Sequence, residues 1–233
     1  MGFEKLVALF RHAYDRGITF FDLADLYGTH LYFREALRSI PREKVTILTK
    51  MWWRYDGPEN KTRMPFRKQV ARSALERFRH ELNTDYIDIV LLHCMTKGTW
   101  DQELQPYMEE LAVAKEKQQV RAVGVSCHDF DALKTAASCP WVDVVLARIN
   151  PKGVKMDGTP EQITAVLKDL KANGKAVIGM KIFGEGQLRG EKEACIQFAQ
   201  ELGVLDAMTI GFEKPEQIDD VLRMIQKYPA KPA

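Results

Sequence analysis

ITFFDLADLYG, residues 18–28, begins as a β-branched and aromatic run and ends on two ionisable side chains, Asp22 and Tyr27. A short apolar run bounded by turn-forming residues is typical of a buried strand. The stretch therefore predicts a strand over 18–22, with a carboxylate at its C-terminal end and a phenol in the loop that follows.

Two later stretches have the same form. VTILTK (45–50) ends its apolar run on Lys50, and YIDIVLLH (86–93) ends its run on His93. Asp22, Lys50 and His93 thus close three successive predicted strands, and Tyr27 follows the first of them.

Outward from these strands, the chain alternates helical and extended patterns. Alternating β and α segments predict a parallel sheet, and the short apolar strands favour an α/β fold of the (β/α)₈ TIM-barrel type, a single domain over residues 1–233. A full barrel has eight strands, whereas this pattern yields seven, so the first strand and its hairpin are expected to be missing ahead of residue 3. The predicted helices cover 3–16, 31–38, 65–82, 103–117, 130–137, 160–172, 191–202 and 215–227, and the strands cover 18–22, 45–50, 86–93, 120–126, 142–149, 176–181 and 206–211.

The composition is that of an ordinary soluble protein. The 233 residues are 45% hydrophobic and 28% charged, with a net charge of +2. No dense basic stripe predicts nucleic-acid binding, and no apolar run has the roughly 18 residues of a membrane span. Four cysteines in a chain of this length predict reduced thiols and a cytoplasmic protein, since they are too few for a disulfide scaffold.

The four strand-end groups predict acid–base chemistry. Active sites of α/β barrels lie at the C-terminal ends of the strands, where these side chains would gather. A tyrosine with a pKa near ~10 is a weak acid at neutral pH, and a neighbouring lysine such as Lys50 is expected to lower that pKa. Asp22 would hold the lysine, and His93 would orient a carbonyl or share its proton. The alternative for any one of them is a plain ion pair or a packing role.

These residues also carry a resemblance. FDLADLYG resembles the D-x-A-x-x-Y-G motif of the aldo-keto reductases, and LTKMW and LLHC resemble the motifs that carry the family's other two catalytic residues. The resemblance implies a (β/α)₈ barrel and NAD(P)H-dependent carbonyl reduction, with Tyr27 as general acid, Lys50 and Asp22 tuning it, and His93 orienting a small-molecule carbonyl substrate. Substrate-pocket aromatics are expected near Lys50, namely Trp52, Trp53 and Tyr55.

Later motifs resemble the family's cofactor-binding segments. GVSCHDF resembles G-V-S-N-F, GMKIFGEG precedes a glycine-rich loop expected to wrap the pyrophosphate, and IGFEKPEQIDD resembles the segment that holds the adenosine half. A simple flexible turn is the alternative for the glycine-rich loop. The resemblance implies NADPH or NADH as cofactor, bound by Ser126, Cys127, Met180, Lys181, Gly184, Gly186, Gly211, Lys214, Gln217 and Asp220.

Three positions in these segments depart from the family pattern. Cys127 replaces an asparagine and Leu146 replaces a glutamine, each a carboxamide-binding residue in the family. Glu213 lies where many NADPH-using members have a serine, and its charge would repel a ribose 2′-phosphate. The charge of Glu213 makes NADH a stronger candidate, and the three departures together indicate an altered cofactor site.

Other interpretations compete with the reductase. A non-catalytic barrel that binds a nucleotide or a protein is the main alternative. A metal site at His93-Cys94 and Cys127-His128 is not favoured, because adjacent strand residues point to opposite faces. An open sheet edge invites pairing, so a homo-oligomer is a further expectation. The remaining histidines are expected on helix faces or the surface: His12, His30 and His80.

Overall fold

The computed structural model describes residues 2–53 and 64–231. The chain divides into two compact units: unit 1 comprises Met1–Cys94 and Asp101–Gly124, and unit 2 comprises Met95–Trp100 and Val125–Ala233. The single domain expected over 1–233 stays a prediction. Strands are ordered along the sheet as they are along the chain, from β1 to β7.

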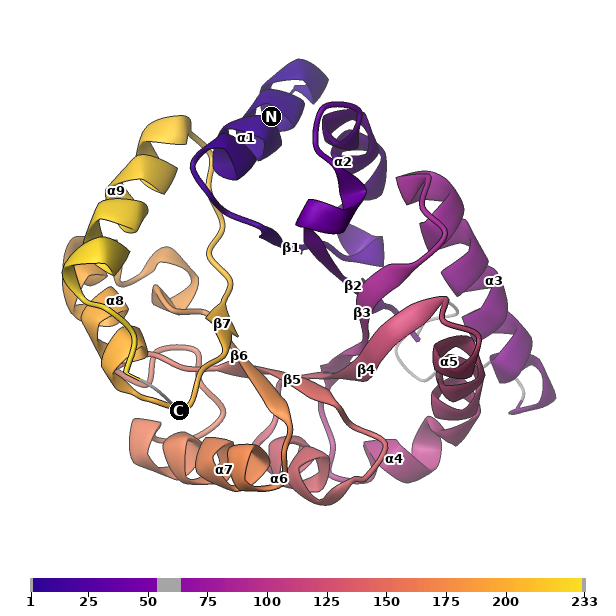
Figure 1. Cartoon of the computed structure of the whole chain (residues 1–233). Helices are drawn as coiled ribbons and strands as arrows, with labels where there is room; N and C mark the ends of the chain where they lie inside the picture. Colours follow the sequence, from indigo (N-terminus) through magenta and orange to yellow (C-terminus); the bar gives the residue numbers. More distant parts are fainter. Residues whose placement is uncertain (1, 54–63, 232–233) are drawn as a thin grey trace. The chain divides into compact units, whose positions relative to one another are not determined.

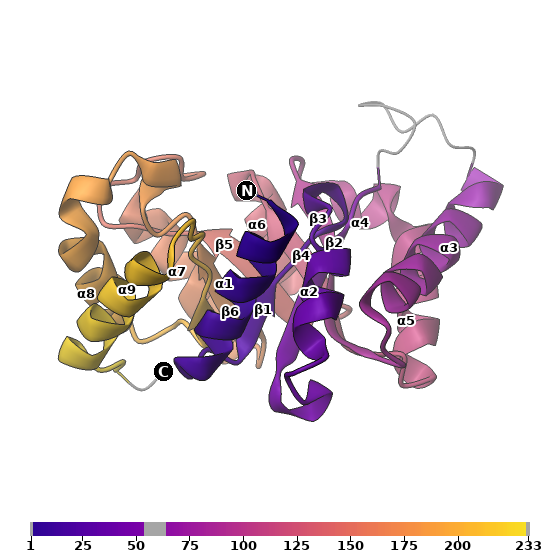
Figure 2. The same ribbon diagram turned by 90° about the horizontal axis from the view of Figure 1, so that it is seen from above.

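Unit 1 alternates strands and helices as the sequence predicts (Figure 1). Its helices α3 and α5 pack side by side, and α1 packs beside α2 (Figure 2). Its elements are α1 (Phe3–Asp15), β1 (Phe20–Asp22), η1 (Asp25–Tyr27), α2 (His30–Leu37), η2 (Arg42–Lys44), β2 (Thr46–Met51), α3 (Met64–Leu82), β3 (Ile87–Met95) and α5 (Gln105–Glu116), with α4 (Trp100–Glu103) and β4 (Val120–Cys127) at the boundary with unit 2.

The strands of unit 1 are parallel and in a fixed register. Asp22 at the end of β1 pairs with Leu48 in β2, and Lys50 in β2 pairs with Leu91 in β3. Nearly every residue of β2 and β3 is buried, so both faces of these strands are covered. This explains why their sequences are continuous apolar runs rather than alternating ones.

Local signals place the turns. Gly17 ends α1 with φ of +92°, a conformation that glycine adopts without a steric penalty, and its N–H donates to the Tyr14 carbonyl at 2.8 Å. The helix predicted over 103–117 is α5, Gln105–Glu116, and a separate short helix, α4, precedes it. Pro106 explains the break between them, because its ring lacks an N–H and fits only the first turn of a helix.

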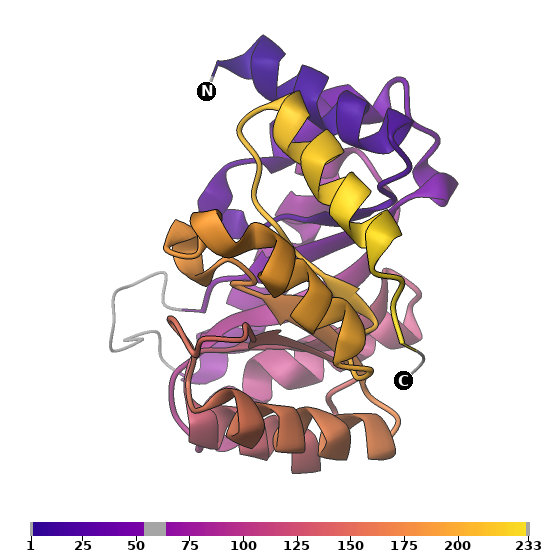
Figure 3. The same ribbon diagram turned by 90° about the vertical axis from the view of Figure 1, so that its left-hand side faces the viewer.

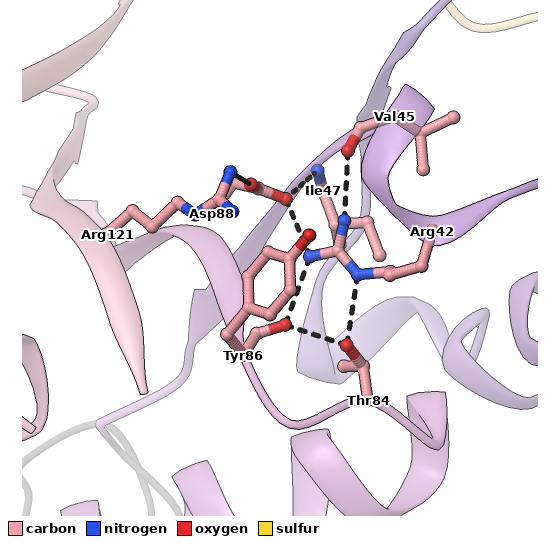
Figure 4. Close-up of polar contacts among 7 residues, drawn as sticks. All are labelled: Arg42, Val45, Ile47, Thr84, Tyr86, Asp88 and Arg121. Carbon is pink, nitrogen blue, oxygen red and sulfur yellow. Dashed lines mark hydrogen bonds and ion pairs between the residues drawn. The ribbon is translucent and has the colours of Figure 1, made fainter. Parts of the chain in front are cut away.

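A polar cluster at the start of the strands joins β2, β3 and β4 within unit 1 (Figure 4). Asp88 of β3 is 6% exposed and accepts hydrogen bonds from the Ile47 N–H, from Arg42 and from Arg121. Both guanidinium groups also lie 4.1 Å from the centroid of the Tyr86 ring. The cluster satisfies a buried carboxylate with two cations, so it is a structural clamp at the end of the strands away from Lys50 and His93.

Unit 2 continues the alternation, with β5, β6 and β7 parallel in that order. Helices α8 and α9 pack side by side (Figure 3), as do α6 and α7. The strand predicted over 206–211 is only two residues long in the structure. The elements are α6 (Phe130–Ser138), β5 (Val144–Arg148), α7 (Pro160–Ala172), β6 (Ala176–Met180), η3 (Gly184–Gly186), η4 (Arg189–Glu191), α8 (Lys192–Glu201), β7 (Ala207–Met208) and α9 (Pro215–Lys227).

No helix formed by residues 2–53 and 64–231 combines the length and the hydropathy needed to cross a bilayer. Within the same residues, no group of three or more His, Cys, Asp or Glu side chains is arranged to hold a metal ion.

Candidate active site

Unit 1 brings together the three strand-end side chains and the following tyrosine that the sequence singles out. Lys50 is 1% exposed, and its Nζ donates to Asp22 Oδ1, to the Leu23 carbonyl at 3.0 Å and to Tyr27 Oη at 3.5 Å. The Tyr27 and His93 rings face each other edge-on with centroids 5.9 Å apart. Asp22, Tyr27, Lys50 and His93 therefore form one cluster, the acid–base cluster.

The backbone has unusual conformations beside two members of this cluster, Tyr27 and His93. After β1 the chain makes the single 3₁₀ turn η1, which ends at Gly28 with φ of +62° and returns Tyr27 toward Lys50. Cys94, directly after His93, has φ of +64°, an uncommon conformation for a residue with a side chain. Strained backbone of this kind is often found at functional sites.

The pKa of the Tyr27 phenol is raised to about 12, first by its partial burial and then by the charges of Asp22 and Cys94. This direction is opposite to the lowering expected from Lys50. The main reason is burial of the phenol, and the charge of Asp22, which pairs directly with the lysine, raises the pKa further. Tyr27 is thus fully protonated at neutral pH, as a proton donor must be, and 53% of its surface is exposed.

The two tryptophans expected in the substrate pocket differ in position. The Trp52 ring lies edge-on to His93 at 5.8 Å and is partly exposed. Trp53 is buried, and its indole N–H donates to the His93 carbonyl at 2.8 Å, so it supports the backbone of His93. Tyr55 lies outside the described residues.

Unit 2 holds the predicted cofactor residues in three groups. The first lies in buried strands: Ser126 and Cys127 end β4, Leu146 is in β5, and Met180 ends β6. Burial is the main cause that raises the pKa of the Cys127 thiol, with Asp157 and Asp129 adding to it, so the thiol stays neutral. A neutral thiol and a leucine provide fewer hydrogen-bonding groups for a carboxamide than the asparagine and glutamine they replace.

The second group lies in the loop after β6. Gly184 and Gly186 have φ of +54° and +87°, and their N–H groups donate to carbonyls within the loop, those of Lys181 and Phe183. A Cβ at Gly184 would come within 2.7 Å of Val154, so this glycine is required by packing against the preceding loop. These two N–H groups are therefore engaged inside the protein, which differs from the expectation that the loop wraps a pyrophosphate with them.

The start of α9 is similarly engaged. Gln217 Oε1 accepts from the N–H groups of Glu213 and Lys214, at 2.8 and 3.2 Å, and so caps the helix. Asp220 pairs with Lys192 and with Arg223. A Cβ at Gly211 would meet nothing within 4 Å.

The chemistry of these segments still fits an anionic dinucleotide. The helix N-terminus of α9 favours anions, and its N-cap residue is the basic Lys214.

The family model for the aldo/keto reductase family matches residues 1–227. The chain belongs to the aldo/keto reductase family. Curated relatives include an aldo-keto reductase of Glycine max, 30% identical over 134 residues, and the methylglyoxal reductase of Escherichia coli, 29% identical over 163 residues. These matches cover 56% and 66% of this chain, but only 37% and 52% of the relatives.

Solved structures of aldo-keto reductases share the fold. A structure from Pseudomonas aeruginosa described as an aldo-keto reductase has a TM-score of 0.79 at 20% identity, covering 98% of this chain and 84% of that one. The holo form of an aldo-keto reductase from Bacillus halodurans has a TM-score of 0.73 at 18% identity, covering 100% and 84%. The fold is thus the α/β barrel of this family, and the described residues form seven of its strands.

The structure also shows one buried polar residue, His30, that the sequence does not single out. His30, expected on a helix face or the surface, is 3% exposed, a correction that follows from its contacts with Glu81 and Thr49. These partners are 51 and 19 residues away in sequence, so no local pattern could indicate them.

Proposed function

We propose that the protein reduces an aldehyde or ketone to an alcohol, with NADH or NADPH supplying the hydride when bound. The observation that carries the proposal is the contact of Lys50 Nζ with both Asp22 and Tyr27 Oη. It joins a protonated phenol to a buried cation at one end of parallel strands, the arrangement needed to protonate a carbonyl oxygen.

Each residue of the acid–base cluster has a distinct role in the proposal. Tyr27 Oη donates its proton to the carbonyl oxygen as charge develops there. Lys50 then stabilises the phenolate through the 3.5 Å contact, and Asp22 keeps the ammonium group charged and in place. His93 orients the carbonyl, and Trp52 beside it forms an apolar wall of the substrate pocket.

Unit 2 would hold the cofactor. Ser126 would bind the carboxamide, and Lys214 with the N-terminus of α9 would bind the anionic adenosine half. Gln217 would donate to the adenosine half through Nε2, since its Oε1 caps the helix. Glu213 at this terminus favours NADH, because a carboxylate repels a 2′-phosphate.

A binding titration tests the cofactor half of the proposal. NADH and NADPH are titrated separately into the purified protein, and their own fluorescence is followed. Saturable binding of at least one, tighter for NADH, supports the proposal. Failure of both to bind to protein shown by circular dichroism to be folded would contradict it.

The alternative is a family member that binds a nucleotide or a protein without catalysis. The engaged side chains of Asp220 and Gln217, together with Cys127 and Leu146, favour this candidate. This candidate predicts that no NADH is oxidised when an aldehyde is added, whether or not the protein binds the cofactor.

A further inference from the structure

A second polar chain runs through unit 1 outside the acid–base cluster. Asp25 Oδ1 accepts from Arg77 at 2.6 Å, and Arg77 donates to Glu81 Oε1 at 3.0 Å. Glu81 Oε2 contacts His30 Nδ1 at 2.7 Å, and His30 Nε2 contacts the Thr49 hydroxyl at 2.8 Å. Four consecutive contacts thus connect η1, α3, α2 and β2.

The two ends of this chain lie beside the residues that perform the proposed chemistry. Asp25 is in the same 3₁₀ turn as Tyr27, and Thr49 directly precedes Lys50 in β2. The chain therefore joins the backbone segment of the proton donor to the backbone segment of its lysine.

The contacts of His30 with Glu81 and Thr49 are the buried part of this series of polar contacts, and the donor and acceptor in each can be assigned. His30 is 3% exposed, packs edge-on against Phe78, and has its pKa lowered mainly by burial, so the ring is neutral. Because Glu81 only accepts, His30 Nδ1–H donates to it, and Nε2 accepts from the Thr49 hydroxyl. Removing one member would leave a buried polar atom unpaired, which strongly favours the intact arrangement.

Local backbone hydrogen bonds form the turn that carries Tyr27. Within η1 the Tyr27 N–H donates to the Ala24 carbonyl at 3.1 Å, and the Gly28 N–H donates to the Asp25 carbonyl at 3.4 Å. The contact of Lys50 with Tyr27 is 3.5 Å long, at the upper limit for a hydrogen bond, so a small displacement of the turn would break it.

We propose that Asp25, Arg77, Glu81 and His30 are positioning residues, which hold the Tyr27 turn at hydrogen-bonding distance from Lys50. This inference rests on the proposed carbonyl reduction. Arg77 is its central member, because it connects the carboxylate of the turn to the carboxylate that contacts His30.

Arg77→Gln tests the role, and Arg72→Gln is its matched control. Arg72 is on the same helix and pairs with Glu110 through two hydrogen bonds of 2.7 and 3.0 Å, but it has no connection to η1 through these contacts. Both arginine side chains are partly exposed, 43% and 60%, so both variants are expected to fold.

We expect Arg77→Gln to lower kcat about tenfold, since misplacing a catalytic group is costly, with the KM for NADH nearly unchanged. Arg72→Gln is expected to stay within about twofold of the wild type. Arg77→Lys, which retains a cation, is expected to recover part of kcat. Equal kcat values for the two glutamine variants would overturn the proposal.

Hydrogen–deuterium exchange supplies a readout that does not need activity. In Arg77→Gln, amides of residues 24–29 should exchange several-fold faster than in Arg72→Gln, while β2 and β3 are unchanged. No selective change in residues 24–29 would overturn the positioning role. If exchange changes selectively but the wild type reduces no carbonyl, the hold on the turn stands and the proposed reaction fails.

Discussion

The acid–base cluster of unit 1 and the cofactor segments of unit 2 differ in how their residues are already engaged. In unit 1, Lys50 contacts Asp22 and Tyr27, so the reactive groups are partners of one another. In unit 2, Gln217 caps a helix and Asp220 pairs with two cations, so the predicted binding groups are partners of the scaffold.

The difference follows from where each group is placed. Groups at the ends of buried strands have fixed positions, and such sites are more exact than sites on loops. The cofactor segments are largely loops and a helix start, and their donors form local hydrogen bonds in the protein alone. The geometry of the acid–base cluster is therefore preset, whereas the proposed cofactor binding would compete with internal contacts.

The largest expected effect is on the proton donor. Tyr27→Phe removes the hydroxyl that lies 3.5 Å from Lys50 and should lower kcat by about 10²–10⁴-fold, with cofactor affinity unchanged. Steady-state oxidation of NADH with an aldehyde measures it. Tyr32→Phe, on α2 against Phe3, is the matched control and should keep full activity. An equal loss of kcat in both variants would contradict the role of Tyr27 as the proton donor.

The next effect concerns the substrate wall. Trp52→Ala removes the ring that lies 5.8 Å from His93 and should raise the KM for an apolar aldehyde about tenfold, through loss of buried apolar area. The dissociation constant of NADH should change little. A similar change in both constants would show that Trp52 is not specific to the substrate.

A smaller effect is expected in unit 2. Glu213→Ser removes a carboxylate near the start of α9 and should tighten NADPH binding about fivefold while NADH binding stays the same, more so at low salt. Glu201→Ser at the end of α8 is the control with the same charge change. If both variants respond alike, net charge rather than the position of Glu213 sets the preference.

The smallest effect is a pH dependence of stability from His30. Its pKa is lowered in the folded protein, so below about pH 6.5 the unfolded chain binds more protons and the free energy of unfolding falls as the pH falls. Urea unfolding of the wild type and of His30→Gln, from about pH 7.5 down to about pH 5, measures this. In His30→Gln the free energy of unfolding should fall less than in the wild type over this pH range.

Asp157 in unit 2 acts in the opposite direction. Its pKa is raised to about 6, chiefly by burial, so the folded protein binds the extra proton and gains stability as the pH falls toward 4. The difference between wild type and His30→Gln cancels this contribution. A pH profile that is unchanged in the variant would mean that His30 is not a titrating group in this range.

The sequence was sufficient for the order of the elements and for the acid–base cluster. Buried strands that end on Asp22, Lys50 and His93 are local signals, and parallel strands necessarily bring their C-terminal ends to one edge. The short helix α4, which is separated from α5 at Leu104, is not among the predicted helices.

The rest depended on contacts distant in the chain. Trp53, predicted in the substrate pocket, is buried against the His93 carbonyl, and its role in substrate binding stays a prediction. Gly184 stays a predicted cofactor contact, but its need to be glycine comes from packing against Val154, which is distant in the chain. The pKa of Tyr27 is raised mainly by burial and then by the charge of Asp22, and residue order alone does not determine how deeply the phenol is buried.

The most direct test of the central claim follows the transferred hydride. NADH deuterated at its transferable position is incubated with an aldehyde and the protein, and the alcohol is analysed by mass spectrometry. The wild type and Tyr32→Phe should place deuterium on the former carbonyl carbon, and Tyr27→Phe should form almost none of this product. No deuterated alcohol from the folded wild type with NADH or NADPH would contradict the assignment of a reductase.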